Sequence, residues 1–359
     1  MPKRAETPAG VVRLLDASLN RASEGARVVE DYARFVLDDL HLTGLAKALR
    51  HDLASAGALL PSVDLLAARD TQGDVGTVIT TANESDRTGA WEVCGASLGR
   101  LQEALRSLEE YSKTIDPAHG SAFEQLRYRT YTLAKAFGAT ERGRDRLGEA
   151  RLYVLIDGRD SADAFAAMVE SLADAGADVL QLRDKRLDDR TLVERGRQLA
   201  DLCRECGGVS IINDRPDIAL AAGADGVHVG QEELSVADVR VVVGTQRLIG
   251  VSTHSIEQAR AAVLDGADYL GVGPTFPSQT KSFDDFPGLD FVREVAEEIT
   301  LPAFAIGGIG EASVGSVIDA GLGRVAVSRA VVDADDPAAV VRRLKDALAG
   351  VVGGATSSG

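Results

Sequence analysis

A short stretch rich in glycine, hydroxyl side chains and one lysine lies in the second half of the chain. It reads GVGPTFPSQTK from Gly271 to Lys281 and directly follows the apolar pair Tyr269 and Leu270. Glycine lets backbone N–H groups approach a ligand closely, and hydroxyl groups with lysine are common partners of phosphate oxygens. The stretch therefore predicts a phosphorylated substrate bound at the end of a strand.

Polar or small residues also follow the other apolar segments of this half. Alternation along an extended strand would place Gln181, Arg183 and Lys185 on one face, as a polar wall with two positive charges. Taken singly, such residues have structural explanations, namely a salt bridge, a buried histidine or a turn. The prediction of a site depends on these residues lying together at one end of the folded strands. The full set is Gln181, Arg183, Lys185, Asn213, Asp214, His228, Gln231, Glu232, Glu233, Ser252, Thr253, His254, Ser278, Thr280, Lys281, Gly307, Gly308, Val327 and Ser328.

One part of this set suits a monophosphate. Gly307, Gly308 and the main chain at Val327 and Ser328 would form a pocket rich in N–H groups, after the last two strands. Barrels of parallel strands commonly bind a phosphate at that position.

A second part carries more charge than one monophosphate needs. Arg183, Lys281 and Ser252 are further donors, while the carboxylates of Asp214 and Glu233 follow adjacent strands and could hold a hard divalent ion. Mg²⁺ is typically bound by one or two carboxylates together with substrate phosphates. This pattern predicts two phosphorylated substrates, one of them a diphosphate bound through Mg²⁺. Because no Ser–His–Asp set or paired-acid motif is evident, we expect stabilisation of a departing diphosphate to supply most of the catalysis.

Eight candidate strands, each followed by a helical segment, would position these residues. Eight such units within about 200 residues favour an α/β fold, a closed (β/α)₈ TIM barrel, over an open sheet. The motif AGAD or a variant precedes each even-numbered strand, at 175–178, 222–225, 265–268 and 320–323, so the barrel is predicted to consist of four similar quarters. The strands are expected at 151–157, 179–185, 209–214, 226–230, 248–253, 269–274, 303–309 and 324–330.

The first 138 residues show helical periodicity. The segment LNRASEGARVVEDY, 19–32, returns as LGRLQEALRSLEEY at 98–111. Apolar or small residues recur at alternating four- and three-residue spacing in both copies, which indicates two long helices paired in a bundle. Charged residues at three-residue spacing are expected to lie away from that seam, either as solvated ion-pair ladders or as two halves of one polar site. They are Arg21, Glu24, Arg27 and Glu30 in the first copy and Arg100, Glu103, Arg106 and Glu109 in the second.

Length and composition agree with two domains. A chain of 359 residues with 45% apolar residues can bury two cores, and we expect a helical domain at 1–138, a charged linker at 139–150, the barrel at 151–348 and a flexible tail at 349–359. A net charge of −16 argues against nucleic acid or an anionic membrane as a partner. No secretory signal or membrane span is evident, so we expect a cytoplasmic protein. Cys203 and Cys206 form a lone C-x-x-C, for which two partly buried thiols are favoured over a metal or redox site.

The barrel half resembles the thiamine-phosphate synthase family. QLRDK, INDRPDIALAAGADGVHVGQEEL, GVSTHS, GVGPTFPSQTK and AIGGI look like its successive motifs, over nearly all of 150–348. The resemblance implies an enzyme that joins hydroxymethylpyrimidine diphosphate to hydroxyethylthiazole phosphate. It implies Gln181, Arg183, Lys185 and Asn213 at the pyrimidine diphosphate, Ser252 and Lys281 at diphosphate oxygens, Asp214 and Glu233 on Mg²⁺, and Ser278, Thr280, Gly308, Val327 and Ser328 at the thiazole phosphate.

Two positions depart from the family pattern without removing a chemical group. The family often has Asp in place of Glu233 and Thr in place of Ser278. Two alternatives remain on the same fold: a thiazole tautomerase and a non-catalytic sensor of phosphorylated ligands. The retained cationic and acidic residues argue against the tautomerase, because that enzyme has no diphosphate to neutralise.

The helical half resembles the small hydroxymethylpyrimidine phosphate kinases that are often fused to thiamine-phosphate synthase. LNRASEGARVVEDYARF, LRHDL, RDTQGDVGT and LQEALRSLEEY carry the likeness, over about residues 11 to 138. The resemblance implies ATP as a co-substrate, although no Walker-type loop is present. The alternative is a dimerisation module without activity, which would make the chain a homo-oligomer. Candidate residues for phosphoryl transfer are Arg21, Arg27, Arg69, Asp70, Asp74, Arg100 and Arg106.

Overall fold

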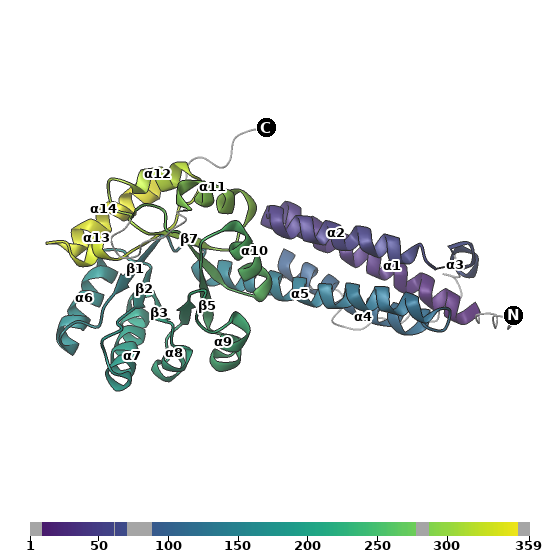
Figure 1. The fold of residues 1–359 in the computed structure, drawn as a ribbon, viewed down its shortest axis with the longest axis horizontal. Coiled ribbons are helices and arrows are strands. Elements are labelled where there is room, and N and C mark those ends of the chain that lie inside the picture. The colour runs from purple at the N-terminus through teal and green to yellow at the C-terminus, as the bar shows by residue number, and fades with distance from the viewer. Residues whose placement is uncertain (1–8, 61, 70–87, 278–286, 351–359) are drawn as a thin grey trace. The chain divides into compact units, whose positions relative to one another are not determined.

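A computed structural model describes residues 9–60, 62–69, 88–277 and 287–350. The chain divides into two compact units, Met1–Phe137 and Gly138–Gly359 (Figure 1). None of the helices in these residues combines the length and apolar content needed to span a bilayer. Most of the predicted tail lies outside the described residues, as does the segment 278–286.

The first unit is helical, as predicted. Its helices α1 and α4 pair along the expected seam, where Ala22 and Ala26 of α1 and Leu101 and Leu105 of α4 are buried. Gly25 allows this close packing, because a Cβ there would lie 3.0 Å from the backbone oxygen of Ser97. The elements are α1 (Ala9–Tyr32), the π-helical turn η1 (Ala33–Leu37), α2 (Leu40–Gly57), α3 (Ser62–Ala68), α4 (Ala90–Ser112) and α5 (Pro117–Leu147), which continues into the second unit.

The alternative of a solvated ion-pair ladder is wrong at the last member of each copy of the charged repeat. Glu30 and Glu109 are only 5% and 2% exposed, and each is paired with an arginine, Arg50 and Arg127 respectively. A three-residue step turns by about 300°, so nine residues after Arg21 the direction has drifted by about 180°. The drift carries the last glutamate to the buried face, where an arginine from another helix compensates its charge.

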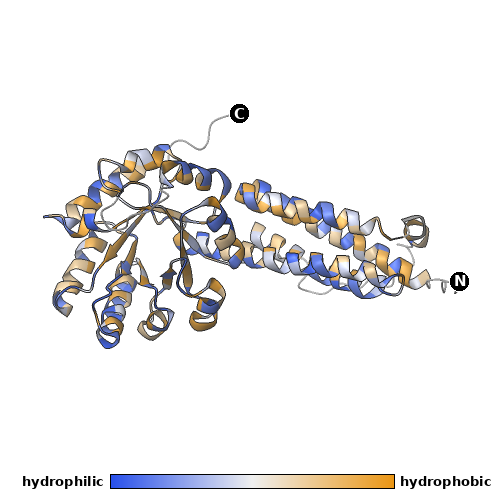
Figure 2. Cartoon of the chain, viewed as in Figure 1, coloured by the Kyte–Doolittle hydropathy of each residue, from blue (hydrophilic) through white to orange (hydrophobic). Residues whose placement is uncertain are grey.

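The second unit is a closed barrel of eight parallel strands, with neighbours in chain order from β1 to β8 and β8 paired back to β1. The predicted fold class is therefore confirmed. The strands are the most hydrophobic part of this unit, while the surrounding helices also carry hydrophilic residues (Figure 2). The strands are β1 (Leu152–Ile156), β2 (Val179–Leu182), β3 (Val209–Asn213), β4 (Gly226–Val229), β5 (Leu248–Thr253), β6 (Tyr269–Val272), β7 (Ala303–Ile306) and β8 (Val325–Val327).

Helices surround the strands, and several begin at a serine or aspartate whose side chain accepts a backbone N–H of the first turn. Ser161, Asp188, Ser235 and Ser255 cap α6, α7, α9 and α10 in this way. The helices are α6 (Ala162–Asp174), α7 (Asp189–Cys206), α8 (Pro216–Ala222), α9 (Val236–Val243), α10 (Ile256–Asp265), α11 (Gly288–Glu298), α12 (Val314–Asp319), α13 (Arg329–Val332) and α14 (Pro337–Ala349).

The aspartates of the repeated AGAD motif join neighbouring strands at their N-terminal ends. Asp178 accepts the backbone N–H groups of Arg151 and Leu152 at 2.8 Å. Asp225 accepts that of Ser210 at 3.0 Å, and Asp268 accepts that of Ile249 at 2.8 Å. Each aspartate lies just before an even-numbered strand and accepts a hydrogen bond from the start of the odd-numbered strand beside it. The repeated motif therefore links strands in pairs.

The predicted linker is largely helical, because residues 139–147 form the last turns of α5. Arg142 pairs with Asp268 and Arg146 with Asp225, at 2.6 and 2.8 Å, so charges of the predicted linker neutralise the motif aspartates. Leu147 joins the core of the barrel. A Cβ at Gly143 would lie 2.0 Å from the backbone oxygen of Asp268, so this approach requires glycine.

The C-x-x-C pair lies at the end of α7. Cys203 is fully buried and Cys206 is exposed, and both are free thiols. Burial raises the pKa of the Cys203 thiol, which makes it a poor nucleophile or metal ligand at neutral pH.

Candidate active site

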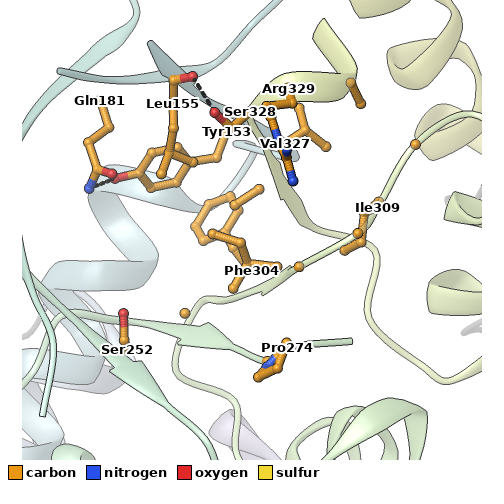
Figure 3. Close-up of a pocket in the computed structure, with 18 of the residues that line it drawn as sticks. Tyr153, Leu155, Gln181, Ser252, Pro274, Phe304, Ile309, Val327, Ser328 and Arg329 are labelled. Carbon is orange, nitrogen blue, oxygen red and sulfur yellow. Dashed lines mark hydrogen bonds between the residues drawn. The ribbon is translucent and has the colours of Figure 1, made fainter. Parts of the chain in front are cut away.

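A pocket of about 990 Å³ opens at the carboxyl ends of the strands (Figure 3). Gln181, Arg183, Asn213, His228 and Ser252 line one part of it, and Gly307, Gly308, Val327 and Ser328 line another. These predicted residues therefore meet at one rim. Ser278, Thr280 and Lys281 lie outside the described residues, although the preceding Pro277 lines the pocket.

Aromatic rings form the floor of the pocket, and sequence reasoning missed them. Tyr153 and Tyr269 each meet the ring of Phe304 edge to face, with centroids 5.3 and 6.0 Å apart. All three rings are buried and belong to strands of the barrel core. Alternation along β1 and β6 could have indicated that the tyrosines point inward, but it does not identify the partners of their hydroxyl groups, which lie on other strands.

Five side chains form a continuous chain of hydrogen bonds across this floor. Gln181 Nε2 donates to the Tyr153 hydroxyl at 3.0 Å, a bond drawn in Figure 3, and the hydroxyls of Tyr153 and Tyr269 are 3.1 Å apart. The Tyr269 hydroxyl lies 3.2 Å from His228 Nδ1. His228 Nε2 lies 2.8 Å from Ser252 Oγ, at the pocket wall.

The groups in this chain are neutral at neutral pH. Burial, with a smaller contribution from the charge of Arg183, lowers the pKa of His228 to about 4. Burial also raises the pKa of Tyr153 and Tyr269. The imidazole and the two hydroxyls therefore act through hydrogen bonds and not through charge.

Arg183 and Lys185 follow β2 on its loop rather than within the strand, because β2 ends at Leu182. Arg183 lines the pocket, whereas the Lys185 side chain is 70% exposed and its Nζ lies 4.0 Å from Asp214 Oδ2. The predicted wall of three strand residues is thus replaced by Gln181 in the barrel and two cations on the loop above it.

The two predicted metal-binding carboxylates lie close enough to influence each other. Burial and the charge of Glu233 raise the pKa of Asp214, while Lys185 and Arg183 act in the opposite direction. Asp214 has a left-handed backbone with φ of 60°, and its N–H donates to the backbone oxygen of His228 at 2.8 Å. The described residues contain no cluster of three or more His, Cys, Asp or Glu that could bind a metal. Asp214 and Glu233 supply only two carboxylates, and one or two carboxylates completed by substrate oxygens are the ligands that Mg²⁺ usually has in proteins.

The Gly-Gly pair after β7 has a conformation that other residues rarely adopt, with φ of 101° at Gly307 and 67° at Gly308. A Cβ on Gly308 would also lie 3.0 Å from the backbone oxygens of Phe276 and Pro277. Ser328 Oγ donates to the backbone oxygen of Leu155 at 3.2 Å (Figure 3). On this side, the pocket is therefore lined by backbone groups rather than by free side-chain hydroxyl groups.

Three of the five candidate residues that the structure describes in the helical unit are engaged in ion pairs. Arg69 makes two hydrogen bonds of 2.8 Å to the buried Asp16, which sequence reasoning missed. Arg27 pairs with Asp31 at 3.2 Å and Arg106 with Glu109 at 2.9 Å. Arg21 and Arg100 are exposed on α1 and α4, and Asp70 and Asp74 lie outside the described residues.

Comparison with known proteins gives similarity over both units. Residues 152–331 match the thiamine monophosphate synthase family, and residues 13–136 match the ThiD2 family. A thiamine-phosphate synthase of Rhodopirellula baltica is 51% identical over 90% of this chain and 89% of its own length, and one of Nostoc punctiforme is 41% identical over 94% of both. The solved thiamine phosphate pyrophosphorylase of Pyrococcus furiosus is 32% identical, with a TM-score of 0.53 over 59% of this chain and 100% of its own.

Proposed function

The chain belongs to the thiamine monophosphate synthase family, and on that basis we propose that its barrel condenses hydroxymethylpyrimidine diphosphate with hydroxyethylthiazole phosphate. The products are thiamine phosphate and diphosphate, so the enzyme is a transferase of thiamine biosynthesis. The observation that carries the proposal is the pocket that Arg183 lines together with Gly307 and Gly308. Asp214 lies close enough to interact electrostatically with Arg183 and with Glu233.

The reaction needs no protein base. The lone pair of the thiazole nitrogen forms a bond to the methylene carbon of the pyrimidine, and the bond from that carbon to diphosphate oxygen breaks with its electron pair on oxygen. The amino group of the pyrimidine stabilises the electron-poor methylene. The protein accelerates this step by holding the two reactants together and by stabilising charge on the leaving group.

The binding roles follow the division of charge in the pocket. The pyrimidine diphosphate is assigned to Gln181, Arg183, Lys185 and Asn213, and diphosphate oxygens to Ser252 and Lys281. The thiazole phosphate is assigned to Ser278, Thr280, Gly308, Val327 and Ser328. The position of Gln181, Arg183, Ser252 and Gly308 around one pocket supports this assignment.

Asp214 and Glu233 would hold Mg²⁺. The ion would neutralise part of the diphosphate charge, which is the chemistry that a hard dication supplies to a phosphate ester. The raised pKa of Asp214 supports this site, because burial and, to a smaller extent, the charge of Glu233 disfavour its ionised form, and a bound cation would favour that form.

The test is steady-state kinetics of the full chain and of Arg183→Ala, with Arg204→Ala as the control. Arg204 is an exposed α7 residue paired with Asp201, so its loss makes the same charge change outside the pocket. Loss of a donor to the leaving group should cost about 3 kcal/mol of barrier, or about a hundredfold in rate, without a matching fall in thermal stability. Near-normal turnover of Arg183→Ala would show that Arg183 does not stabilise the leaving group. An intact chain that forms no thiamine phosphate would favour the tautomerase or the sensor.

We further propose that the helical unit phosphorylates hydroxymethylpyrimidine phosphate with ATP and so supplies the diphosphate to the barrel. The match of residues 13–136 to the ThiD2 family supports this proposal. Phosphoryl transfer requires cations at the moving group and usually a metal held by carboxylates, and the arginines of α1 and α4 with Arg69, Asp70 and Asp74 are the candidates.

The full chain, given ATP, Mg²⁺ and hydroxymethylpyrimidine phosphate, should form ADP and the pyrimidine diphosphate, both observable by phosphorus NMR. Addition of thiazole phosphate should then yield thiamine phosphate. A chain that condenses supplied diphosphate but forms no ADP from the monophosphate would make the helical unit a structural or dimerisation module and leave the synthase intact.

A further inference from the structure

The hydrogen-bond chain beneath the pocket has a direction that can be obtained by counting hydrogens. Gln181 Nε2 donates to the Tyr153 oxygen, so the hydrogen of Tyr153 is directed to its other partner, Tyr269. The hydrogen of Tyr269 is then directed to His228 Nδ1, which must carry no proton in order to accept it.

The direction of the hydrogen bonds at His228 determines whether the Ser252 hydroxyl can donate to a ligand. An imidazole with a bare Nδ1 carries its hydrogen on Nε2, and this nitrogen lies 2.8 Å from Ser252 Oγ. Ser252 therefore accepts from His228, and its own hydrogen remains for a group in the pocket that it lines. With the opposite direction, Ser252 would donate to His228 and present only lone pairs to an anionic substrate.

We propose that Tyr153 and Tyr269 are positioning residues that hold His228 in the Nε2–H tautomer and thereby make the Ser252 hydroxyl a donor to the departing diphosphate. The proposal rests on the synthase function of the barrel. Neither tyrosine donates to the diphosphate. Each acts on the donor role of the Ser252 hydroxyl through His228.

Burial makes such a chain stable in one direction. Tyr153, Tyr269 and Gln181 are 3%, 1% and 2% exposed, so water cannot readily supply a replacement donor or acceptor. Removal of one hydroxyl leaves the adjacent groups without a fixed partner, and His228 can then adopt either tautomer.

The test combines nitrogen-15 NMR of the histidine rings with kinetics of the full chain. His228, one of five histidines, is assigned from the signal lost in His228→Asn. The intact protein should show a bare Nδ1 and a protonated Nε2. Tyr269→Phe and Tyr153→Phe keep the rings, and each should give a mixture of tautomers and a fall in kcat, about tenfold for Tyr269→Phe, with a smaller change in KM. Tyr111→Phe, an exposed tyrosine of α4, is the control.

Two results would overturn the proposal: a protonated Nδ1 in the intact protein, or tyrosine variants that keep the Nε2–H tautomer and normal kcat. Thermal melts of both variants confirm that the kinetic comparison is made on folded protein. The tautomer is read in free protein without substrate, so it tests the hydrogen-bond chain even where the synthase assay itself gives no product.

Discussion

Replacement of Asp268 by asparagine should destabilise the barrel at the end opposite the pocket. Asp268 is fully buried and accepts hydrogen bonds from Arg142 and Arg240, both at 2.6 Å, and from the Ile249 N–H. Loss of one partner from a buried ion pair typically costs about 3–5 kcal/mol. The arginine side chains are 30% and 21% exposed, so water screens them in part and the lower value, about 3 kcal/mol, applies. For a unit of this size, such a loss in the free energy of unfolding should lower Tm by about 6–12 °C.

The assay is urea unfolding of the full chain, followed by circular dichroism and by tryptophan fluorescence. The chain has one tryptophan, Trp91 in α4, so fluorescence reports the helical unit alone while circular dichroism reports both. The barrel transition of Asp268→Asn should occur at lower urea. Asp201→Asn is the control, because Asp201 and its partner Arg204 are about two-thirds exposed and such pairs contribute at most about 1 kcal/mol. A loss below about 1 kcal/mol in Asp268→Asn would refute the view that Arg142, within the predicted linker, belongs to the barrel.

Three further predictions concern other parts of the chain. Asp214→Asn should raise the Mg²⁺ concentration needed for half-maximal rate, and an unchanged Mg²⁺ titration would place the metal elsewhere. Gly308→Ala should raise KM for the thiazole phosphate more than that for the pyrimidine diphosphate, because a Cβ there would meet the Phe276 backbone at 3.0 Å and a φ of 67° is unfavourable for alanine. Burial acts to raise the pKa of Glu109, but the hydrogen bond and charge of Arg127 outweigh it and the net pKa is lowered. The resulting stabilisation is present above the unfolded value, about 4.5, and is lost as pH falls below it; Glu109→Gln should abolish this part of the acid sensitivity measured by Trp91 fluorescence.

Strand ends were predictable because a strand–helix unit leaves a local pattern. The apolar run before Gln181 and Arg183 and the helical segment after them place both residues at a carboxyl end, whatever the neighbouring strands are. Parallel closure then brings all such ends to one rim, so Asn213, Ser252 and Gly308 reach the same pocket.

The barrel, the helical pair and the residue types at the rim could be predicted from the amino-acid order, since each depends on periodicities and motifs within a few tens of residues. The groups that meet across the core are known only from the folded chain. The bonded hydroxyls of Tyr153 and Tyr269 are 116 residues apart, and Arg142 and Asp268 are 126 residues apart. The burial of Glu109 likewise depends on Arg127 from another helix. Such pairs carry no local signal, because the desolvation of a polar group and the partner that compensates it exist only after distant segments have packed together.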